Sequence, residues 1–518
     1  MRTKISLVLL LMVSTILSIS ATEHVYNVLD FGARGDGKTN NTKAINAAVE
    51  AAAKNGGGTV FFPAGDFLSF TIRMKSKITL HLDQGAVLIG DKEVNGVGYD
   101  LPEADAWYKK FQDFGHSYWT NSLIYGDSLH DIAITGNGMI WGKGLYTYDK
   151  PGIKGSGNKA IGLKNCYNVT IKDISILHGG HFCILATGVD NLTIDNVRAD
   201  ADRDAFDIDC CKNVRISNCN INSPTDDGLC LKSSFGLGYA RITENVTITN
   251  CQVYGYDHGT LMDGTFQKVF KDEDPGANHS ITGRLKLGTE SNGGFRNITV
   301  SNCVFEHSRG ICIETADGGL IEDVVINGIT MRDVTDTPFF LRLNARMRGP
   351  EATPVGVCRR ITISNIIVYD VGGRPKFPGL GAGMVMGIPG HYIEDLTLSN
   401  IRIIFRGGTS KEAIDMEVPQ NIDMYPDPYR WHTLPAYGMY FRYVKGLRVS
   451  DVVLSYMNRD ERPAFVLDDV HNAGFYHIDA QKGEGVPRFL LKNVTHFSTH
   501  QVNGMEDTKL EKAERVEL

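Results

Sequence analysis

The chain has 518 residues, of which 42% are hydrophobic and 22% are charged, the proportions of a soluble globular protein. Its net charge of −7 and pI of about 6.1 exclude a general attraction for nucleic acid or for an anionic membrane surface. An anionic ligand would therefore need a locally basic site.

Residues 1–20 have a basic start, a long apolar stretch and small residues at the end. This layout is typical of a secretory signal peptide, with cleavage expected near Ser20. A membrane anchor is the alternative, but no later segment is apolar over the roughly 18 residues that a membrane helix needs. We expect a secreted or periplasmic protein that does not bind a membrane.

A helix is predicted over residues 42–54, which are rich in alanine and carry apolar residues at helical spacing. The run ends before three glycines at 56–58, and TVFFPAG then reads as a first strand and turn.

Downstream, one pattern recurs, in which alternating β-branched residues stand between polar residues, as in NVTIKDI and NVRISNC. Period-two alternation predicts strands, and the tightest spacings between units are 23, 22 and 26 residues. Short strands at such a spacing indicate a solenoid. Ten units begin at Asp131, Asn168, Asn191, Asn213, Asn245, Asn297, Asp323, Arg360, Asp395 and Gly446.

The predicted fold is therefore an all-β, single-domain, right-handed parallel β-helix. The N-terminal helix would cap its open end, because an uncovered sheet edge invites pairing with other chains. We expect the β-helix to span residues 21–504 and residues 505–518 to form a charged tail or a short helix. The repeated asparagine is interpreted as an internal amide ladder.

The chain has ten cysteines, and several of them occupy the same place in the repeat, after an asparagine. We expect mostly free, buried thiols that act as small core residues. No CxxC pair of the kind that marks a zinc site is present, and no metal or cofactor is predicted.

The repeat also aligns candidate catalytic residues. Counting thirteen residues from the start of four units reaches His181, Asp204, Asp226 and His258. Adjacent rungs lie about 4.8 Å apart, so stacked carboxylates would raise each other's proton affinity, as a general acid requires. Asp227 lies one residue further on. A Ca²⁺ site, or solvated turn aspartates, is the alternative interpretation.

Paired carboxylates, without a nucleophilic serine or cysteine, fit glycoside hydrolysis. At these residues the chain resembles glycoside hydrolase family 28, the polygalacturonase and rhamnogalacturonase group. The resemblance rests on DFGARGDGKTNNTKAI, on DRDAFDIDCCKNVRISNC and on SPTDDGLCLKSS with its downstream Lys232. The sequence DHG at 257–259 matches the family's Gly-His-Gly in part.

The resemblance implies an inverting mechanism without a cofactor. Asp227 would be the acid, Asp204 and Asp226 would hold and deprotonate the attacking water, and His258 would tune the acid. Lys232 matches the lysine that follows the family's aspartate pair. His181 is counted with the substrate-binding candidates.

Departures from the family pattern concern the substrate. Asp202-Arg203 stands where the family has Asn-Thr, and Cys312 and Glu314 stand where its Arg-Ile-Lys is expected. Arg284-Leu285-Lys286, one unit earlier, either replaces the lost cations or is exposed strand charge. Arg342 and Arg346 either bind a uronate carboxylate or lie in a solvated loop.

Aromatic residues interrupt the repeat in two inserts, with Trp107, Tyr108 and Trp119 in one and Tyr425, Tyr429 and Trp431 in the other. Such loops would either close one end of a sugar groove, making the enzyme exo-acting, or pack against the solenoid wall.

The predicted function is a secreted, exo-acting hydrolase of galacturonate-containing pectic polysaccharide or oligosaccharide, which is expected to be a monomer with no nucleic-acid partner. A rhamnogalacturonan-specific hydrolase, a β-helix lyase and a non-catalytic glycan-binding β-helix remain open.

Overall fold

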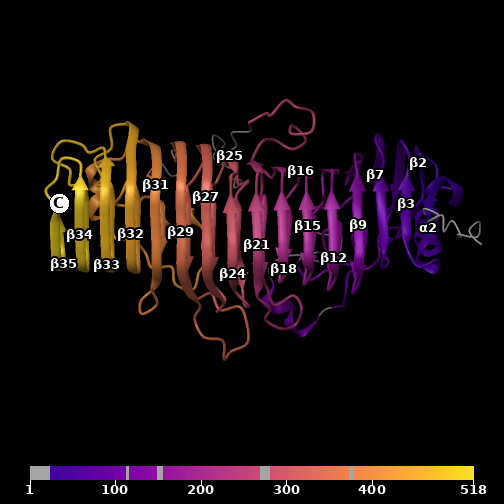
Figure 1. Cartoon of the computed structure of the whole chain (residues 1–518), viewed down its shortest axis with the longest axis horizontal. Helices are drawn as coiled ribbons and strands as arrows, with labels where there is room; N and C mark the ends of the chain where they lie inside the picture. Colours follow the sequence, from indigo (N-terminus) through magenta and orange to yellow (C-terminus); the bar gives the residue numbers. More distant parts are fainter. Residues whose placement is uncertain (1–23, 105, 113–115, 149–155, 269–280, 373–378) are drawn as a thin grey trace, which may run out of the picture.

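The computed structural model describes residues 24–104, 106–112, 116–148, 156–268, 281–372 and 379–518. The predicted signal peptide lies outside the described residues. Thirty-five strands join in one continuous sheet that winds along the long axis of the molecule (Figure 1).

The strands of the N-terminal rungs are β1 Val25–Asn27, β2 Asp36–Asn40, β3 Gly58–Phe62, β4 Gly65–Ser69, β5 Ile72–Arg73, β6 Ile78–Leu82, β7 Ala86–Gly90, β8 Ile124–Asp127, β9 His130–Gly136 and β10 Met139–Trp141. The central rungs contain β11 Lys159–Lys164, β12 Tyr167–Lys172, β13 Ser175–Leu177, β14 Phe182–Thr187, β15 Asp190–Asp195, β16 Arg198–Asp200, β17 Asp204–Asp209, β18 Lys212–Ser217, β19 Asn220–Asn222, β20 Leu229–Ser233, β21 Thr243–Thr249, β22 Gln252–Tyr254, β23 Leu285–Ser291, β24 Phe295–Ser301, β25 Val304–Ser308 and β26 Ile311–Thr315. The C-terminal rungs contain β27 Leu320–Val334, β28 Phe339–Leu343, β29 Val357–Val371, β30 Gly383–Met386, β31 Ile393–Gly407, β32 Met439–Asn458, β33 Phe465–Ala480, β34 Phe489–Val502 and β35 Thr508–Glu517. Short 3₁₀ turns lie at η1 Val28–Phe31, η2 Trp107–Phe111, η4 Lys411–Asp415 and η5 Pro428–Trp431.

From β11 to β24 each strand pairs in parallel with the strand three places later, so three ladders run along the axis. One ladder passes through β14, β17, β20 and β23, and another passes through β13, β16, β19 and β22. Alternate side chains of most strands point inward and form one continuous apolar core along the solenoid. The predicted parallel β-helix is thus confirmed.

The N-terminal end is covered by α2 Thr42–Lys54, which coincides with the predicted helix (Figure 1). Ile45, Ala48, Val49 and Ala52 are buried, because a spacing of three and four residues places them on one face. That face packs against the first strands. None of the helices in the described part of the chain is long and apolar enough to cross a membrane.

The repeated asparagine has a different place from the one predicted. All ten residues that begin the repeat units have a positive φ, between 51° and 75°, because the chain turns a corner of the solenoid there. Asparagine tolerates this left-handed conformation better than most residues. Amide bonds join Asn191 to Asn168 (2.8 Å) and run from Asn297 through Asn245 to Asn213, while Asn191 accepts from Arg215, and these amides are exposed rather than internal.

The C-terminal segment also differs from the prediction. Residues 508–517 form β35, which pairs antiparallel with β34 and covers the last edge of the sheet, rather than a tail or a helix. All ten cysteines are free and buried, as predicted.

Candidate active site

Two consecutive turns bring three aspartates together. Asp204 is the first residue of β17, and Asp226 and Asp227 lie in the turn before β20. The hydroxyls of Ser223 and Thr225 fasten this turn to the preceding rung by donating to the carbonyls of Arg203 (2.6 Å) and Asp202 (2.5 Å). The three carboxylates each offer an oxygen within 4.8 Å of the others.

The repeat count aligned four candidate residues. At two of these four positions, the observed strand register is shifted by one residue from the prediction. Phe182, not His181, is paired with Asp204, and Phe206 is paired with Leu229. Two residues earlier along each chain segment, the same register places Asp227, and not Asp226, beside Asp204. The amide of Ala205 accordingly donates to the Asp227 carbonyl at 3.1 Å. The turn before β20 contains one residue more than a strict repeat allows.

Asp227 is buried between two cations. Arg284 Nε lies 2.5 Å from one carboxylate oxygen and Lys286 Nζ lies 3.5 Å from the other. Burial alone would raise the pKa of Asp227, but the charges of Arg284, Lys286 and Lys232 hold it well below its usual range. Asp227 is therefore an ionised carboxylate.

Asp204 has the opposite character. Burial and the neighbouring Asp226 carboxylate raise the pKa of Asp204 to about 8, although Arg203 and Lys232 oppose that rise. Asp226 is the most accessible of the three, with 29% of its side chain exposed. At neutral pH the Asp204–Asp226 pair therefore holds a proton beside the ionised Asp227.

A guanidinium lies between the two members of that pair. Arg203 Nε is 2.9 Å from Asp226 Oδ2, and its Nη1 is 3.5 Å from Asp204 Oδ2. The same Nη1 donates to His181 Nε2 at 2.6 Å, and the guanidinium lies over the Phe182 ring at 5.4 Å. His181 is therefore placed against Arg203.

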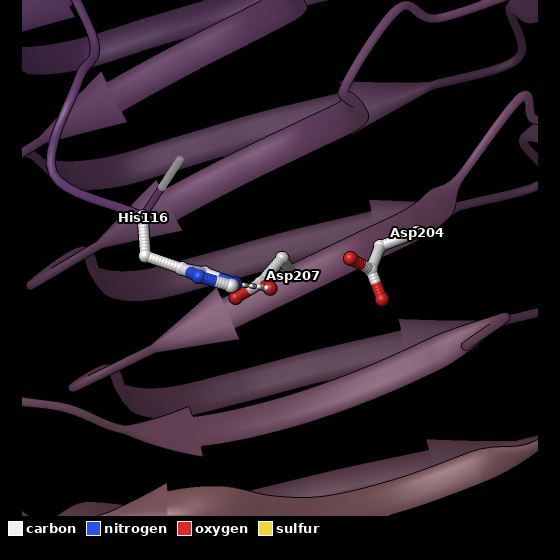
Figure 2. A group of neighbouring side chains, drawn as sticks. All are labelled: His116, Asp204 and Asp207. Atoms are coloured by element: carbon white, nitrogen blue, oxygen red, sulfur yellow. Dashed lines mark hydrogen bonds and ion pairs between the residues drawn. The ribbon is translucent and has the colours of Figure 1, made fainter. Parts of the chain in front are cut away.

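Beside the aspartates, a buried polar layer covers the outer face of the strands. Figure 2 shows His116 directed at Asp207, with Asp204 nearer the start of the same strand. His116 Nε2 is 3.0 Å from Asp207, and Lys232 Nζ lies 3.9 Å from Asp207 and 3.6 Å from Glu290. Although burial lowers the pKa of His116, Glu290 and Asp207 raise it above its ordinary value. Lys232 therefore belongs to this layer.

The cations expected from the family pattern stand in the strand that follows the aspartates. Arg284 directly precedes β23, and Lys286 is the second residue of this strand, which pairs with β20. Both cations are buried beside Asp227, so they are not exposed strand charge. Lys286 Nζ also lies 2.8 Å from the Tyr425 hydroxyl, so the second aromatic insert reaches the site. Glu314 stands behind, 3.8 Å from Lys286 Nζ.

Arg342 and Arg346 occupy positions different from those predicted for uronate ligands. Arg342 is buried and donates to the carbonyls of Gly387, Gln420 and Asn421, so it fastens a loop. Burial and the nearby Arg442 lower its pKa to about 9. Arg346 forms an ion pair with the buried Asp317. Both guanidinium groups have partners within the fold.

His258 lies in a turn of the insertion, outside the strands, and not in the predicted register. Its Nδ1 is 3.1 Å from the Ala201 carbonyl and 3.9 Å from Asp202, whose carboxylate is 2.6 Å from His178. His258 thus borders the turn that carries Asp204, on the Asp202 side. The contacts of His258 do not include Asp227, the residue it was expected to tune.

The aromatic inserts have mixed roles. Trp119 is buried against Phe182 and Leu185, and Trp431 is buried among the apolar side chains of the outer strand face. Both of these tryptophans pack against the solenoid wall. Trp107 is 64% exposed and is held edge-on by Tyr108, Phe111 and Phe235.

Sequence reasoning overlooked three residues that complete the site. Arg203 was visible only as a departure from the family pattern, and Glu290 follows the displaced Arg-Leu-Lys. His116 lies in an insert without periodicity, so no sequence signal indicated it.

Within the part of the chain that the structure describes, two side-chain groups have the spacing of a metal site, namely His116–Asp204–Asp207 and Asp204–Asp226–Asp227. The second group does not fit a Ca²⁺ ion, because Arg203, Arg284 and Lys286 already bind its carboxylates and offset their charge.

Comparisons with known proteins agree with this architecture. The family model described as "Rhamnogalacturonase A/epimerase, pectate lyase-like" matches residues 25–183, and the model "Right handed beta helix region" matches residues 115–269. The fold is a right-handed parallel β-helix, and the first of these two models describes a pectate lyase-like family.

A "Probable polygalacturonase" of Vitis vinifera is 28% identical over 393 residues, which cover 70% of this chain and 77% of that protein. An "Exo-poly-alpha-D-galacturonosidase" of Dickeya chrysanthemi is 25% identical over 61% of this chain and 52% of that protein. The structure of the Yersinia enterocolitica family 28 exopolygalacturonase superposes with a TM-score of 0.61 at 16% identity, over 89% of this chain and 79% of that one. The chain is thus similar to polygalacturonases in sequence and to a family 28 exopolygalacturonase in fold.

Proposed function

We propose that the protein is a secreted glycoside hydrolase that cleaves O-glycosidic bonds of galacturonate-containing pectic polysaccharide or oligosaccharide. One observation carries the proposal: three carboxyls lie within 4.8 Å of one another, and their surroundings hold one ionised and keep a proton on the pair. Acid and base catalysis of glycoside cleavage requires neighbouring carboxyl groups that differ in their pKa. The names of the Vitis and Dickeya relatives support the substrate class.

The roles differ from the sequence-based assignment. Asp227 does not fit the acid, because a carboxylate clamped by Arg284 and Lys286 retains no proton to donate. We assign Asp227 as the base that receives the proton of the attacking water, and the Asp204–Asp226 pair as the acid. Asp204 carries the proton, and Asp226, the exposed member of the pair, receives it from Asp204 and passes it to the glycosidic oxygen.

The short separation of the carboxyls would by itself fit a retaining enzyme. We propose the inverting reaction that the family resemblance implies. The anomeric configuration of the first product, followed by NMR, tests this step. An initial product with the configuration of the substrate would rule out inversion.

Positive charge around the site supports an anionic sugar. Arg203, Lys232, Arg284 and Lys286 gather here although the whole chain is acidic. Lys286 and Arg203 are the candidates nearest the acids for contact with a uronate carboxylate. Exo action is supported by the name of the Dickeya relative and by the insert that brings Tyr425 to Lys286. We propose a monomer without metal, cofactor or nucleic-acid partner.

The decisive experiment measures hydrolysis of oligogalacturonides and rhamnogalacturonan oligosaccharides by the wild type and by Asp226→Asn. We expect wild-type turnover of oligogalacturonides and a fall of about 10²–10⁴-fold in the variant, the usual contribution of general acid catalysis. Asp83→Asn, on an exposed turn between β6 and β7, is the matched control and should be fully active.

The remaining candidates have distinct outcomes in the same assay. Turnover of rhamnogalacturonan oligosaccharides, without turnover of oligogalacturonides, would establish a rhamnogalacturonan-specific hydrolase. Products with an ultraviolet-absorbing double bond would establish a lyase, and oligosaccharide binding without turnover by the wild type would establish a glycan-binding β-helix.

A further inference from the structure

The turn before β17 contains a charged residue that the proposed acid–base chemistry leaves unexplained. Arg203 precedes Asp204 directly, and its side chain is 16% exposed. Because guanidinium is always protonated, it can only donate, so His181 Nε2 must accept the 2.6 Å bond from Arg203. His181 Nδ1 then carries the hydrogen and donates to the Thr147 carbonyl at 2.5 Å. The histidine is therefore neutral, in one tautomer.

Three contacts fix the guanidinium in place. His181 accepts a hydrogen bond from Nη1, the Phe182 ring lies against the plane of the guanidinium, and Asp226 Oδ2 forms an ion pair with Nε. The charged and titratable groups that face the guanidinium are Asp204, Asp207, Asp226, His181, Tyr148 and Lys159. Of these, Asp226 lies nearest among the carboxylates, at 2.9 Å.

We propose that Arg203 is a positioning residue that holds Asp226 beside Asp204 and sets the proton affinity of that pair, with His181 as its anchor. This inference rests on the proposed function, because the pair is the acid of the reaction. A positive charge beside a carboxyl pair favours its ionised form and so limits how tightly the pair holds its proton. Without that charge the pair would remain protonated to a higher pH.

The test compares Arg203→Gln and Arg203→Lys with the wild type. In Arg203→Gln we expect the alkaline limb of the kcat/KM profile to move up by about one pH unit, because an adjacent opposite charge shifts an Asp pKa by about 1–3 units. We also expect kcat to fall about 10²-fold at the optimum, because Asp226 loses its orientation. Arg203→Lys should keep the limb near the wild-type position, since it keeps the charge.

Arg215→Gln is the matched control. Arg215 lies on the outer face of β18, exposed, with Asn191 and Thr193 as its partners, and its replacement should leave the profile unchanged. A limb that stays in place in Arg203→Gln, with only a loss of thermal stability, would overturn the proposal.

The anchor is tested separately. His181→Gln keeps an oxygen acceptor for the guanidinium and an N–H donor for Thr147, whereas His181→Ala keeps neither. We expect the alanine variant to reproduce part of the Arg203→Gln shift and the glutamine variant to restore the wild-type limb. Equal profiles for both variants would contradict the anchoring role.

A measurement without substrate separates this inference from the proposed function. The folded state takes up protons at the pair, so the wild-type Tm should fall as the pH rises towards 8. In Arg203→Gln this fall should continue to a higher pH. If the wild type hydrolyses no pectic substrate, the proposed function fails, but the Tm comparison still decides the role of Arg203. Parallel Tm profiles would reject it.

Discussion

Asp204 and Asp227 show how the same side chain acquires opposite character on adjacent rungs. Both are buried, and burial raises the pKa of each. Asp227 has two cations within 3.5 Å, which more than offset the cost of ionisation. Asp204 faces another carboxylate, with Arg203 at 3.5 Å, and keeps its proton. The protonation state of each aspartate thus depends on the charged side chains that surround it on the neighbouring rungs.

The first prediction concerns the pH dependence of activity and stability. Since the pKa of Asp204 is raised to about 8, the acid pair loses its proton and kcat/KM should fall as the pH rises through about 8. The folded-state pKa exceeds that of the unfolded chain, so the stability contribution of Asp204 is complete below pH 4 and is lost by pH 8.

Asp204→Asn separates the two effects. The variant should be inactive at every pH, yet its Tm should exceed that of the wild type above pH 8, because an amide cannot ionise. Both are measured by kinetic and thermal-unfolding profiles from pH 4 to pH 9. A variant that is no more stable than the wild type at pH 9 would contradict the raised pKa.

The second prediction concerns the buried pair of Arg284 and Asp227. Arg284→Met should lower the free energy of unfolding by about 3 kcal/mol, because it leaves Asp227 buried with one cation fewer. Asp227→Asn should have a comparable cost. The double variant should lose less than the sum of the two and remain inactive, as measured by chemical denaturation and kinetics. Strict additivity would mean that the two side chains do not interact.

At the scale of the element, the corner residues determine where the chain changes direction. A strand-forming sequence alone would continue straight, whereas a left-handed residue close to the start of a strand, such as Asn191 in β15, turns the chain into the next face. Asn245 has a φ of 58° and bonds to Asn213 below (3.0 Å) and Asn297 above (2.8 Å). The corner therefore combines a conformational preference with a side-chain ladder.

The third prediction separates these two contributions at one corner. Asn245→Gly keeps the left-handed conformation and loses the ladder bonds, whereas Asn245→Ala loses both. The alanine variant should be less stable than the glycine variant by about 1–2 kcal/mol, the cost of placing an ordinary residue in this conformation. Denaturation midpoints measure the difference. Equal stabilities would show that the conformation at the corner is not limiting.

The period-two repeat and the alanine-rich segment sufficed to predict the ladder of strands and the helix over residues 42–54, because both signals are local. They did not show which way the corner asparagines face, since alternation counts only the inward positions. The sequence brought the three aspartates to neighbouring rungs. The sequence could not predict the ion pairs of Asp227, because Arg284 follows an insertion whose path through space has no sequence signal. For the same reason the anchoring of Arg342 by distant carbonyls was not foreseeable.

At the scale of the whole molecule, both ends of the solenoid are covered. The helix α2 lies over the first rungs and β35 pairs with β34 at the other end (Figure 1). A solenoid rung contacts only its neighbours, so its terminal rungs need such covers. The candidate site lies in the central rungs, many strands from either cover.

The fourth prediction follows from the C-terminal cover. Removal of residues 505–518 exposes the edge of β34, and exposed edges pair with other chains. The truncated protein should associate or aggregate in size-exclusion chromatography. The fraction that stays monomeric should keep the full-length kcat/KM, because the site does not contact β35. Loss of activity in that fraction would show that the end of the solenoid supports its centre.

The ten buried thiols give the molecule a set of internal reporters. They are distributed from Cys166 to Cys358, over the rungs that contain and flank the candidate site, and none is linked to another. Burial raises the pKa of Cys183, Cys211 and Cys358, so these sulfurs resist alkylation while their rungs stay closed. The order in which a small alkylating reagent marks the ten positions under mild denaturation would then record which part of the coil opens first, rung by rung, without any engineered label.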